Sequence, residues 1–519
     1  MEVALAFPVA YLLSALAIRM TIPAAPRIGL VDRPGGHKQH EHHVPLVGGV
    51  GIFVAIAAVL IVGAYHQPDQ QAFFGSLLIG ATLLFVVGLI DDVYPLGVRI
   101  RFVAQAAAAS ITALWGGIML HDFGALVSTQ TLFLGVMALP VTLFATAGVI
   151  NALNMVDGAD GLSGSLSMVS LALLAIVAFN AGAEAYLAVT LTLLGAVGGF
   201  LVFNLRCCGR PRARVFMGDA GSTLLGFLFA CLFVGLAQGE SRAMSPVTAL
   251  WLFAVPLFDT TAIMVRRVWL GRSPFSPDRW HLHHLLLDAG FTVPQGVLLM
   301  AALQLLFGVV GLIGWYQAVP EYLMFGAFVG LFTLYLHQVS RPWRCVPLLR
   351  QIHRNLDLPV AGVHSVFIGG LAQDIAEERL RALLAEHLTD YGYELFDYAD
   401  PVTGQQQLYA RVDIGCERTA PKVIRELRAR LRPGDELEIR QFIPRDARHD
   451  RRQGHHGPDV EQRRVDRRSG VSKLIARHPP AAVSSASAAP PRRPADGPGR
   501  ARVPQMYSQQ APVRHGKRH

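Results

Sequence analysis

The sequence has little charge for its length. Of its 519 residues, 16% are Asp, Glu, Lys or Arg, whereas 52% are hydrophobic. Soluble globular proteins carry about 25% charged residues. The composition therefore excludes a soluble globular protein and predicts a multi-span membrane protein, and we expect no nucleic-acid partner.

Cysteine is also scarce. The five cysteines fall in apolar runs or in segments expected on the cytoplasmic side, so no disulfide framework or thiolate metal site is indicated. The first apolar run, residues 3–22, lacks a preceding basic region and an evident small-residue cleavage site. We expect this run to remain as a span, because a signal peptide would show both features.

Long apolar runs are abundant instead. A helix needs about 20 apolar residues to cross a bilayer. Runs close to that length cover residues 3–22, 46–65, 72–90, 102–119, 132–150, 165–180, 185–205, 220–238, 247–265, 295–315 and 322–338. The predicted fold is an all-α polytopic membrane domain over residues 1–340, with about eleven transmembrane helices.

The basic residues predict the orientation. The loops 23–45, 91–101, 151–164, 206–219 and 266–294 together hold thirteen Lys or Arg, and the five loops between them hold one, Arg242. Short basic loops stay on the cytoplasmic side. We therefore expect the N-terminus outside and the C-terminus inside, with the polar clusters described below on the cytoplasmic side.

A polar stretch follows the fifth run directly: Asn151-Ala-Leu-Asn154-Met-Val-Asp157-Gly-Ala-Asp160-Gly161. If the helix continues past residue 150, Asn151, Asn154 and Asp157 share one face, and the glycines then release the chain. Oxygen ligands grouped in this way suit Mg²⁺, which phosphate-bearing substrates bring with them. The alternative is a solvated loop with helix-ending glycines.

A second acidic cluster ends the third run. Asp91 and Asp92 lie at a helix C-terminus, where the helix dipole is negative and adjacent acids repel each other. A bound cation, the pair Arg99 and Arg101, or Lys38 would compensate these charges. The alternative is a simple charge pair at a helix end.

Two further acids flank or enter spans. Asp219 lies between glycines at the start of the eighth run, where it would reach a ligand or cap the helix. Asp259 lies inside the ninth run, and intramembrane acids are usually functional or paired. A helix-end ion pair with Arg266 or Arg267 is as well supported as a catalytic role.

Two cytoplasmic loops carry candidate phosphate-binding side chains: Lys38 and His40 in the first, and Arg279, His281, His283 and His284 in the last. Imidazole and guanidinium groups donate hydrogen bonds to phosphate oxygens. A zinc site is the rival for the histidines, and ordinary basic retention is the rival for the first loop. The neighbouring carboxylates favour Mg²⁺ over zinc.

The composition changes after residue 340. Residues 341–359 are expected to be a linker. Residues 360–443 show β-α-β-β-α-β order in the segments 365–369, 376–388, 393–398, 406–414, 421–431 and 436–442. This order is typical of a small ferredoxin-like α/β domain. Residues 444–519 are basic and poor in large apolar residues, which predicts a disordered tail close to anionic lipid.

Taken together, the motifs resemble one enzyme family. They are Asp32-x-Pro34 with Lys38, His40, Pro45 and Gly48-Gly49; Asp91-Asp92; Asn151-x-x-Asn154-x-x-Asp157-Gly-x-Asp160-Gly-Leu162; Phe216-Met-Gly-Asp219-x-Gly-Ser222; and Ser273-Pro-Phe-Ser-Pro-Asp278-Arg-x-His281-x-His283-His284. Over residues 1–340 the chain resembles the polyprenyl-phosphate N-acetylhexosamine-1-phosphate transferases of the glycosyltransferase 4 class. It is most similar to the branch that transfers N-acetylglucosamine 1-phosphate to undecaprenyl phosphate.

The resemblance implies a reaction and a location. A sugar 1-phosphate would pass from a UDP-N-acetylhexosamine to undecaprenyl phosphate in the bacterial cytoplasmic (inner) membrane, with UMP released and Mg²⁺ or Mn²⁺ required. The product would start a lipid-linked cell-envelope polysaccharide. A homodimer, and polysaccharide-assembly partners that bind the domain after residue 340, are open alternatives.

The resemblance also implies residue roles. The catalytic set would be Asp91, Asp92, Asp157, Asp160, His281, His283 and His284. The substrate-binding set would be Lys38, His40, Asn151, Asn154 and Arg279, and the metal ligands would be Asp219 and Asp157. The family usually has Asn and Arg ahead of the lysine, where this chain has Gly35 and His37. A fixed positive charge at position 37 is therefore not expected.

Several alternatives stay open. The attacking phosphate monoester has a second pKa of roughly 6, so it needs little help from a base. Direct attack, with Asp91 or Asp92 taking any residual proton, is favoured over an aspartyl-phosphate intermediate. Another UDP-N-acetylhexosamine or UDP-muramoyl-pentapeptide would fit the same chemistry. A solute or ion transporter is the alternative from another class.

Overall fold

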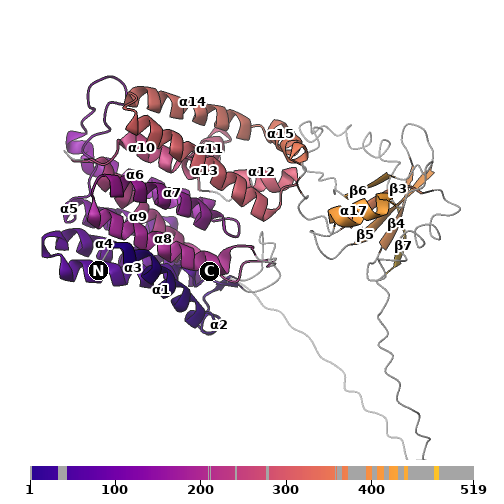
Figure 1. The fold of residues 1–519 in the computed structure, drawn as a ribbon, viewed down its shortest axis with the longest axis horizontal. Helices are drawn as coiled ribbons and strands as arrows, with labels where there is room; N and C mark the ends of the chain where they lie inside the picture. The colour runs from indigo at the N-terminus through magenta and orange to yellow at the C-terminus, as the bar shows by residue number, and fades with distance from the viewer. Residues whose placement is uncertain are drawn as a thin grey trace, which may run out of the picture.

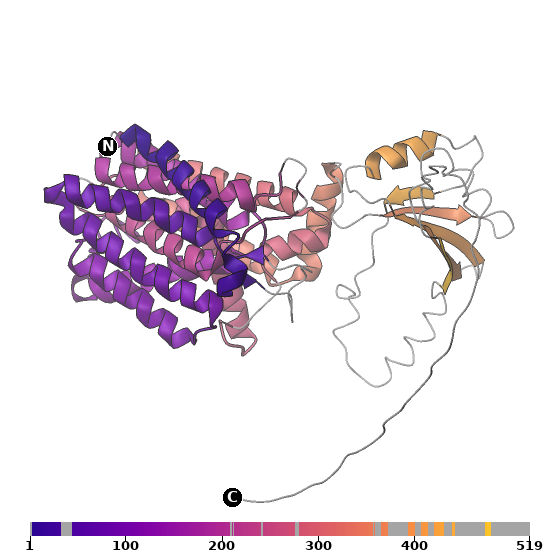
Figure 2. The ribbon, with the colours of Figure 1, turned by 90° about the horizontal axis from the view of Figure 1, so that it is seen from below.

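The computed structural model describes residues 3–32, 44–207, 210, 212–239, 242–275, 280–356, 358, 365–371, 393–399, 406–413, 420–429, 438–441 and 473–478. Within these residues the N-terminal part is a bundle of helices (Figures 1 and 2). Three of the predicted binding residues, Lys38, His40 and Arg279, lie outside the described residues.

Long helices form the bundle: α1 (Ala6–Thr21), α3 (Gly48–His66), α4 (Gln71–Val93), α5 (Val98–Leu114), α6 (Ala138–Val156), α7 (Leu162–Asn180), α8 (Glu184–Asn204), α9 (Gly218–Ala237), α11 (Ala254–Trp269), α13 (Val293–Tyr316) and α14 (Glu321–Val339). Shorter helices are α2 (Ala25–Ile28), α10 (Pro246–Leu252), α12 (Leu282–Ala289) and α15 (Pro342–Asn355). A small antiparallel ribbon pairs β1 (Val31–Asp32) with β2 (Val44–Pro45).

The number of spans is lower than the sequence predicted. Among the described residues, nine helices are long and apolar enough to cross a membrane, and the bent pair α10 and α11 makes a tenth if it is one span. The run at 102–119 forms α5, which has only 17 residues and begins with Arg99 and Arg101 in its first turn. Of the roughly eleven expected spans, nine or ten are therefore long and apolar enough among the described residues, and α5 is the one that falls short.

Helix α9 is the centre of the bundle. In its most apolar 18-residue stretch, 89% of the residues are buried, against 11% in the corresponding stretch of α14. Glycines on the neighbouring helices allow its N-terminus to come close. A Cβ atom added to Gly49 of α3 would lie 2.5 Å from the backbone nitrogen of Gly221, and one added to Gly88 of α4 would lie 2.5 Å from Cα of Ala220. These close contacts fix the position of the start of α9, which carries Asp219.

Helices α10 and α11 meet at a sharp break, with an angle of 84° between them. The break frees backbone groups that have no water to bind inside a membrane. Gln304 of α13 donates to the Leu252 carbonyl oxygen at 2.7 Å and accepts from the Val255 N–H at 3.0 Å, and Ser170 donates to the same Leu252 oxygen at 2.7 Å. The apolar run at 247–265 is continuous, so hydropathy alone did not reveal the break.

The C-terminal elements are β3 (Ser365–Leu371), β4 (Tyr393–Ala399), β5 (Gln406–Asp413), α17 (Ala420–Ala429), β6 (Glu438–Gln441) and β7 (Lys473–His478). The strands form one antiparallel sheet in the order β6-β3-β5-β4-β7. The expected helix at 376–388 lies outside the described residues. Strand β7 falls in the tail expected to be disordered, and its pairing with β4 corrects that prediction for residues 473–478.

Candidate functional site

The ends of α4 and α9 meet through a carboxylate. Asp92 accepts hydrogen bonds from the backbone N–H groups of Asp219 at 2.7 Å and of Ala220 at 3.1 Å. A helix N-terminus attracts negative charge and offers unpaired N–H groups. Gly218, with a φ of 74°, begins the helix and leaves room for the carboxylate. The residue that caps α9 is thus Asp92, which frees the Asp219 side chain for other contacts.

Asp219 contacts the end of α6. The amide of Asn154 donates to Oδ1 of Asp219 at 2.6 Å and to the hydroxyl of Ser222 at 3.0 Å. Three segments far apart in the sequence therefore meet at one point: residues 91–92, residues 151–157 and residues 218–222. The acid-bearing ends of α4 and α6 thus converge on the start of α9.

Asp91 is compensated by an arginine. Its Oδ1 accepts from the Leu96 N–H at 2.6 Å, and its Oδ2 lies 3.3 Å from Nη1 of Arg101. The Asp91 side chain is 5% exposed, and its Oδ2 accepts no hydrogen bond from the described residues. Of the compensating groups that the sequence offered, the structure places Arg101 there.

Asp157 and Asp160 have different surroundings. The Ser163 hydroxyl donates to Oδ1 of Asp157. Burial, together with the negative charges of Asp219 and Asp160, raises the pKa of Asp157 to about 6, although the hydrogen bond from Ser163 opposes this rise. Asp160 instead accepts from Nε of Arg206 at 2.6 Å and from the Ala213 N–H at 2.9 Å. Asp160 therefore holds the segment before α9 and is less available to a ligand than Asp157.

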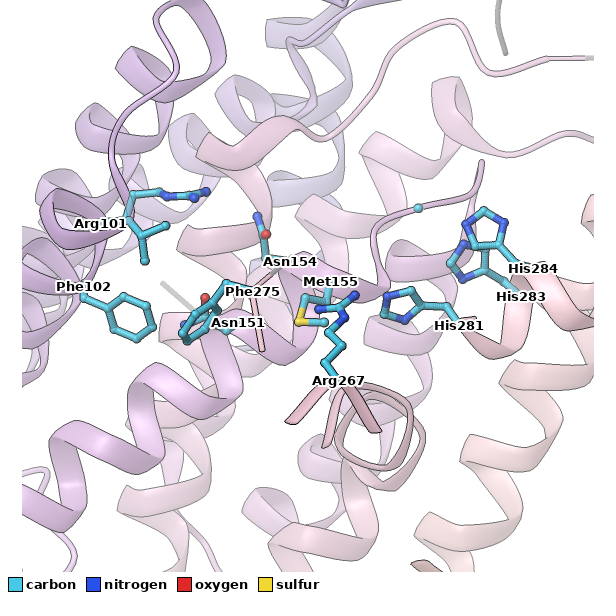
Figure 3. A pocket seen from close by; sticks show the side chains of 12 residues that line it. Arg101, Phe102, Asn151, Asn154, Met155, Arg267, Phe275, His281, His283 and His284 are labelled. Atoms are coloured by element: carbon cyan, nitrogen blue, oxygen red, sulfur yellow. The ribbon is translucent and has the colours of Figure 1, made fainter. Parts of the chain in front are cut away.

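A cavity of about 340 Å³ opens beside this acidic cluster (Figure 3). Its lining residues are Val98, Arg101, Phe102, Asn151, Asn154, Met155, Gly158, Arg267, Phe275, His281, His283 and His284. Asn154 and Arg101 belong both to the cavity and to the acidic cluster, since they also contact Asp219 and Asp91. Asn151 reaches the cavity while its amide donates to Gln105 at 3.1 Å.

His281 is held by a buried acid. Nδ1 of His281 lies 2.8 Å from Oδ2 of Asp259, and Oδ1 of Asp259 accepts from the Leu282 N–H and from the Tyr335 hydroxyl, each at 2.8 Å. Asp259 has no exposed surface. The alternative of an ion pair with Arg266 or Arg267 is therefore wrong.

The two arginines have other neighbours. Nη1 of Arg267 donates to the Pro274 carbonyl oxygen at 2.6 Å, and the Arg266 guanidinium lies 4.6 Å from the centre of the Trp280 ring. Both contacts hold the segment that leads from α11 to α12. Arg267 also lines the cavity, which places one guanidinium beside the histidines.

His283 has a buried ring without hydrogen-bond partners. Neither ring nitrogen is bonded to a described residue. A Cβ atom added to Gly158 would lie 2.8 Å from Nε2 of His283, so only glycine fits there. Burial, together with positive charge on the neighbouring His284, lowers the pKa of His283 to about 3, although the Asp259 carboxylate opposes this shift. At neutral pH this ring is uncharged, and it offers a ligand one donor and one acceptor.

The donor set of the site favours one kind of metal. Among the described residues, no group of three or more His, Cys, Asp or Glu side chains is arranged to hold a metal ion. The histidines therefore give no support to the zinc alternative. Mg²⁺ usually takes one or two carboxylates and completes its shell with water and substrate phosphates. The oxygen donors of Asp219 and Asp157 fit that pattern.

The structure thus brings together most of the predicted site. The residues near the acidic cluster or the cavity are Asp91, Asp92, Asn151, Asn154, Asp157, Asp160, Asp219, His281, His283 and His284. Sequence reasoning missed Tyr335 and Ser163, and it gave Asp259 no definite role. The signal for Asp259 was its position inside an apolar run, whereas Tyr335 carried no signal, since its contact depends on the fold.

Fold and site define a polytopic membrane protein whose acidic cluster adjoins a polar cavity. The glycosyl transferase family 4 model matches residues 74–237. The chain is 36% identical over 347 residues to the undecaprenyl-phosphate alpha-N-acetylglucosaminyl 1-phosphate transferase of Escherichia coli strain K12, covering 67% of this chain and 93% of that protein. The protein of the same name from Salmonella typhi is 38% identical over 347 residues, which cover 67% of this chain and 93% of that protein. The one from Haemophilus influenzae is 37% identical over 347 residues, which cover 67% of this chain and 97% of that protein.

These similarities identify the family. The chain belongs to glycosyl transferase family 4, and it is an enzyme of the polyprenyl-phosphate sugar-1-phosphate transferase type. The transporter alternative is thereby excluded. The match covers 67% of this chain, so about a third of the chain has no counterpart in these relatives.

Proposed function

We propose that this protein transfers N-acetylglucosamine 1-phosphate from UDP-N-acetylglucosamine to undecaprenyl phosphate and releases UMP. The observation that carries the proposal is the junction at Asn154 and Arg101, where an acidic cluster suited to Mg²⁺ adjoins a cavity with polar and aromatic walls. The names of the relatives support the choice of donor and acceptor.

Asp219 and Asp157 would hold Mg²⁺, which neutralises diphosphate charge when it is bound. Asn154 orients Asp219 through its hydrogen bond, and Ser163 orients Asp157. Asp92 acts as a positioning residue, because both of its oxygens accept from the backbone at the start of α9. Arg101 stands between Asp91 and the cavity, so it would meet a phosphate that enters from that side.

In the proposed reaction an oxygen of the lipid phosphate attacks the sugar-linked phosphorus, and the bond from that phosphorus to the UMP oxygen breaks. The acceptor is already mostly dianionic, since its second pKa is roughly 6. Asp91, whose Oδ2 is ion-paired with Arg101 but accepts no hydrogen bond from the described residues, would take any residual proton. Positioning two anions is then the main task of the site.

The histidines would bind the donor's phosphates and sugar. Asp259 accepts from Nδ1–H of His281, which leaves Nε2 of that ring for the cavity side. The uncharged His283 would supply hydrogen bonds rather than positive charge. Lys38, His40 and Arg279 keep their proposed phosphate-binding roles, although they lie outside the described residues.

We further propose the setting of the enzyme. The protein would lie in the bacterial inner membrane with the site and the C-terminus in the cytoplasm, in line with the basic loops. Helix α5 would be an eleventh span, because α4 and α6 both carry site residues at their C-terminal ends and the chain must cross back between them. Strands β3 to β6 with α17 would belong to a ferredoxin-like domain.

The decisive experiment measures UMP release by the purified protein from UDP-N-acetylglucosamine, with and without undecaprenyl phosphate. We expect release that requires both the acceptor and Mg²⁺ and that stops in excess EDTA. Full activity in EDTA, or no release with any acceptor, would overturn the proposal. Rapid UMP formation without acceptor would instead favour an aspartyl-phosphate intermediate.

A panel of UDP-sugars tests the donor. UDP-N-acetylglucosamine should give the highest kcat/KM, ahead of other UDP-N-acetylhexosamines and of UDP-muramoyl-pentapeptide. A higher value for one of the others would reassign the substrate while leaving the reaction class in place.

A further inference from the structure

Helix α15 (Pro342–Asn355) follows the last membrane helix almost immediately. Only Ser340 and Arg341 separate it from α14, which ends at Val339. At 1.5 Å per residue, the 19 residues of α14 span about 28 Å, close to the roughly 30 Å thickness of the hydrocarbon core. Helix α15 therefore begins at the surface of the bilayer.

One side of α15 packs on the protein. Cys345 and Val346 are buried in the cluster that contains Leu285 and Leu286 of α12, and Leu349 packs against the same cluster. Arg350 donates to the Asp288 carbonyl oxygen at 3.1 Å. Helix α12 carries His283 and His284, so α15 packs against the helix that holds two of the cavity histidines.

Another side of α15 is apolar and uncovered. Leu348, Ile352 and Leu356 follow one another at four-residue intervals and are 50%, 37% and 57% exposed. Residues at this spacing form one stripe along a helix. Leu356 directly follows the last residue of α15, and its N–H donates to the Ile352 carbonyl oxygen. We call these three residues the α15 stripe. Gln351 and Asn355, which are also exposed, lie beside it on the polar side.

The α15 stripe continues a surface that already faces lipid. Helix α14 presents exposed apolar side chains over its length, including Leu323 at 55% and Leu334 at 57%. Figures 1 and 2 show α15 turning away from the axis of α14 and lying across the end of the bundle, beside α12. A helix in this position, with apolar and polar sides, suits the interface of a leaflet.

We propose that the α15 stripe is inserted among the acyl chains of the leaflet at the site end of the bundle, so that α15 is a membrane-surface helix that anchors α12 at the level of the lipid headgroups. The occupant of the stripe is the lipid bilayer, not another protein. The proposal concerns the membrane surface only and does not depend on the reaction proposed above.

A spin-label experiment tests this placement on the full-length protein in nanodiscs of phosphatidylethanolamine and phosphatidylglycerol. A nitroxide is attached at Ile352→Cys, and the matched control carries it at Gln351→Cys, about 100° further round the helix. Collision with oxygen, which concentrates among acyl chains, is compared with collision with a water-soluble nickel chelate. The unmodified protein, with its five cysteines, supplies the background signal.

We expect the label at 352 to meet oxygen more often than nickel, and the label at 351 to show the reverse order. A third label at Leu356→Cys should repeat the result at 352, because it lies on the same stripe. Strong collision with nickel at 352 would place the stripe in water and overturn the proposal. Low collision with both reagents would mean that protein covers the stripe, which also overturns it and favours a second copy or the C-terminal sheet as the occupant.

Discussion

The two halves of the site differ in how their polar atoms are satisfied. In the acidic half, formed by the ends of α4, α6 and α9, Asp92 and Asp219 are held by hydrogen bonds from other parts of the chain. In the histidine half, formed by α11 and α12, His281 is held by Asp259, but both nitrogens of His283 are buried without a partner among the described residues. Asp92 and Asp219 are thus positioned by the chain itself, whereas His283, like Oδ2 of Asp91, keeps polar atoms for a ligand.

The largest effect is expected in the acidic half. Asp219→Asn keeps the size of the side chain and removes the charge that would face the metal. We expect kcat to fall by about 10²–10³-fold, the usual cost of losing one preorganised electrostatic group. UMP release at saturating substrates measures the loss, and an unchanged thermal unfolding temperature shows that the bundle is intact. A loss of less than tenfold would remove Asp219 from the metal site.

The next effect is expected in the histidine half. Asp259→Asn removes the acceptor that selects the tautomer of His281. Loss of a group that orients a site residue typically costs about 10–100-fold. Tyr335→Phe is the matched control, since it removes a hydrogen bond to the same carboxylate but leaves the His281 contact. Equal losses in the two variants would show that Asp259 supports the fold and not His281.

Acidification should affect the two halves in opposite directions. The pKa of His283 is lowered to about 3, so its contribution to the free energy of unfolding is present above the unfolded value near 6.5 and is lost as the pH falls below it. The pKa of Asp157 is raised to about 6, so its contribution is present below the unfolded value near 3.8 and is lost as the pH rises through 6.

The variants His283→Gln and Asp157→Asn separate these contributions. Between pH 7 and pH 5, the unfolding temperature of His283→Gln should fall less than that of the wild type, and that of Asp157→Asn should fall more. The metal-free protein is used, so that metal release does not add to the change. Shifts of the same sign in the two variants would contradict the assignment of a neutral His283 and a protonation-prone Asp157.

The contrast between the halves also bears on what the sequence could predict. Asp91, Asp92, Asn154 and Asp219 could be found because acids and amides grouped at the ends of apolar runs usually serve a ligand or a polar partner. The partner of Asp259 was misjudged because nearby arginines are visible in a sequence, whereas His281, 22 residues away, is brought close only where the chain turns back between α11 and α12. The break between α10 and α11 was missed for the same reason, because the backbone groups that it frees are bonded by Gln304, a residue of another helix, and local pattern does not report such contacts.

The smallest effect is expected from removing the C-terminal residues, provided that the truncation point lies after α15. Removing all residues after 358 deletes the C-terminal sheet, which contributes none of the residues that line the cavity. Transfer activity should then stay within about twofold, as for surface changes worth less than 0.5 kcal/mol.

Removing all residues after 345 also deletes Val346 and Leu349, which pack in the cluster that contains Leu285 and Leu286. That shorter protein should lose activity and unfold at a lower temperature, because α12 loses its support while the acidic half keeps all its contacts. If the two truncated proteins behaved alike, the histidine half would not depend on α15.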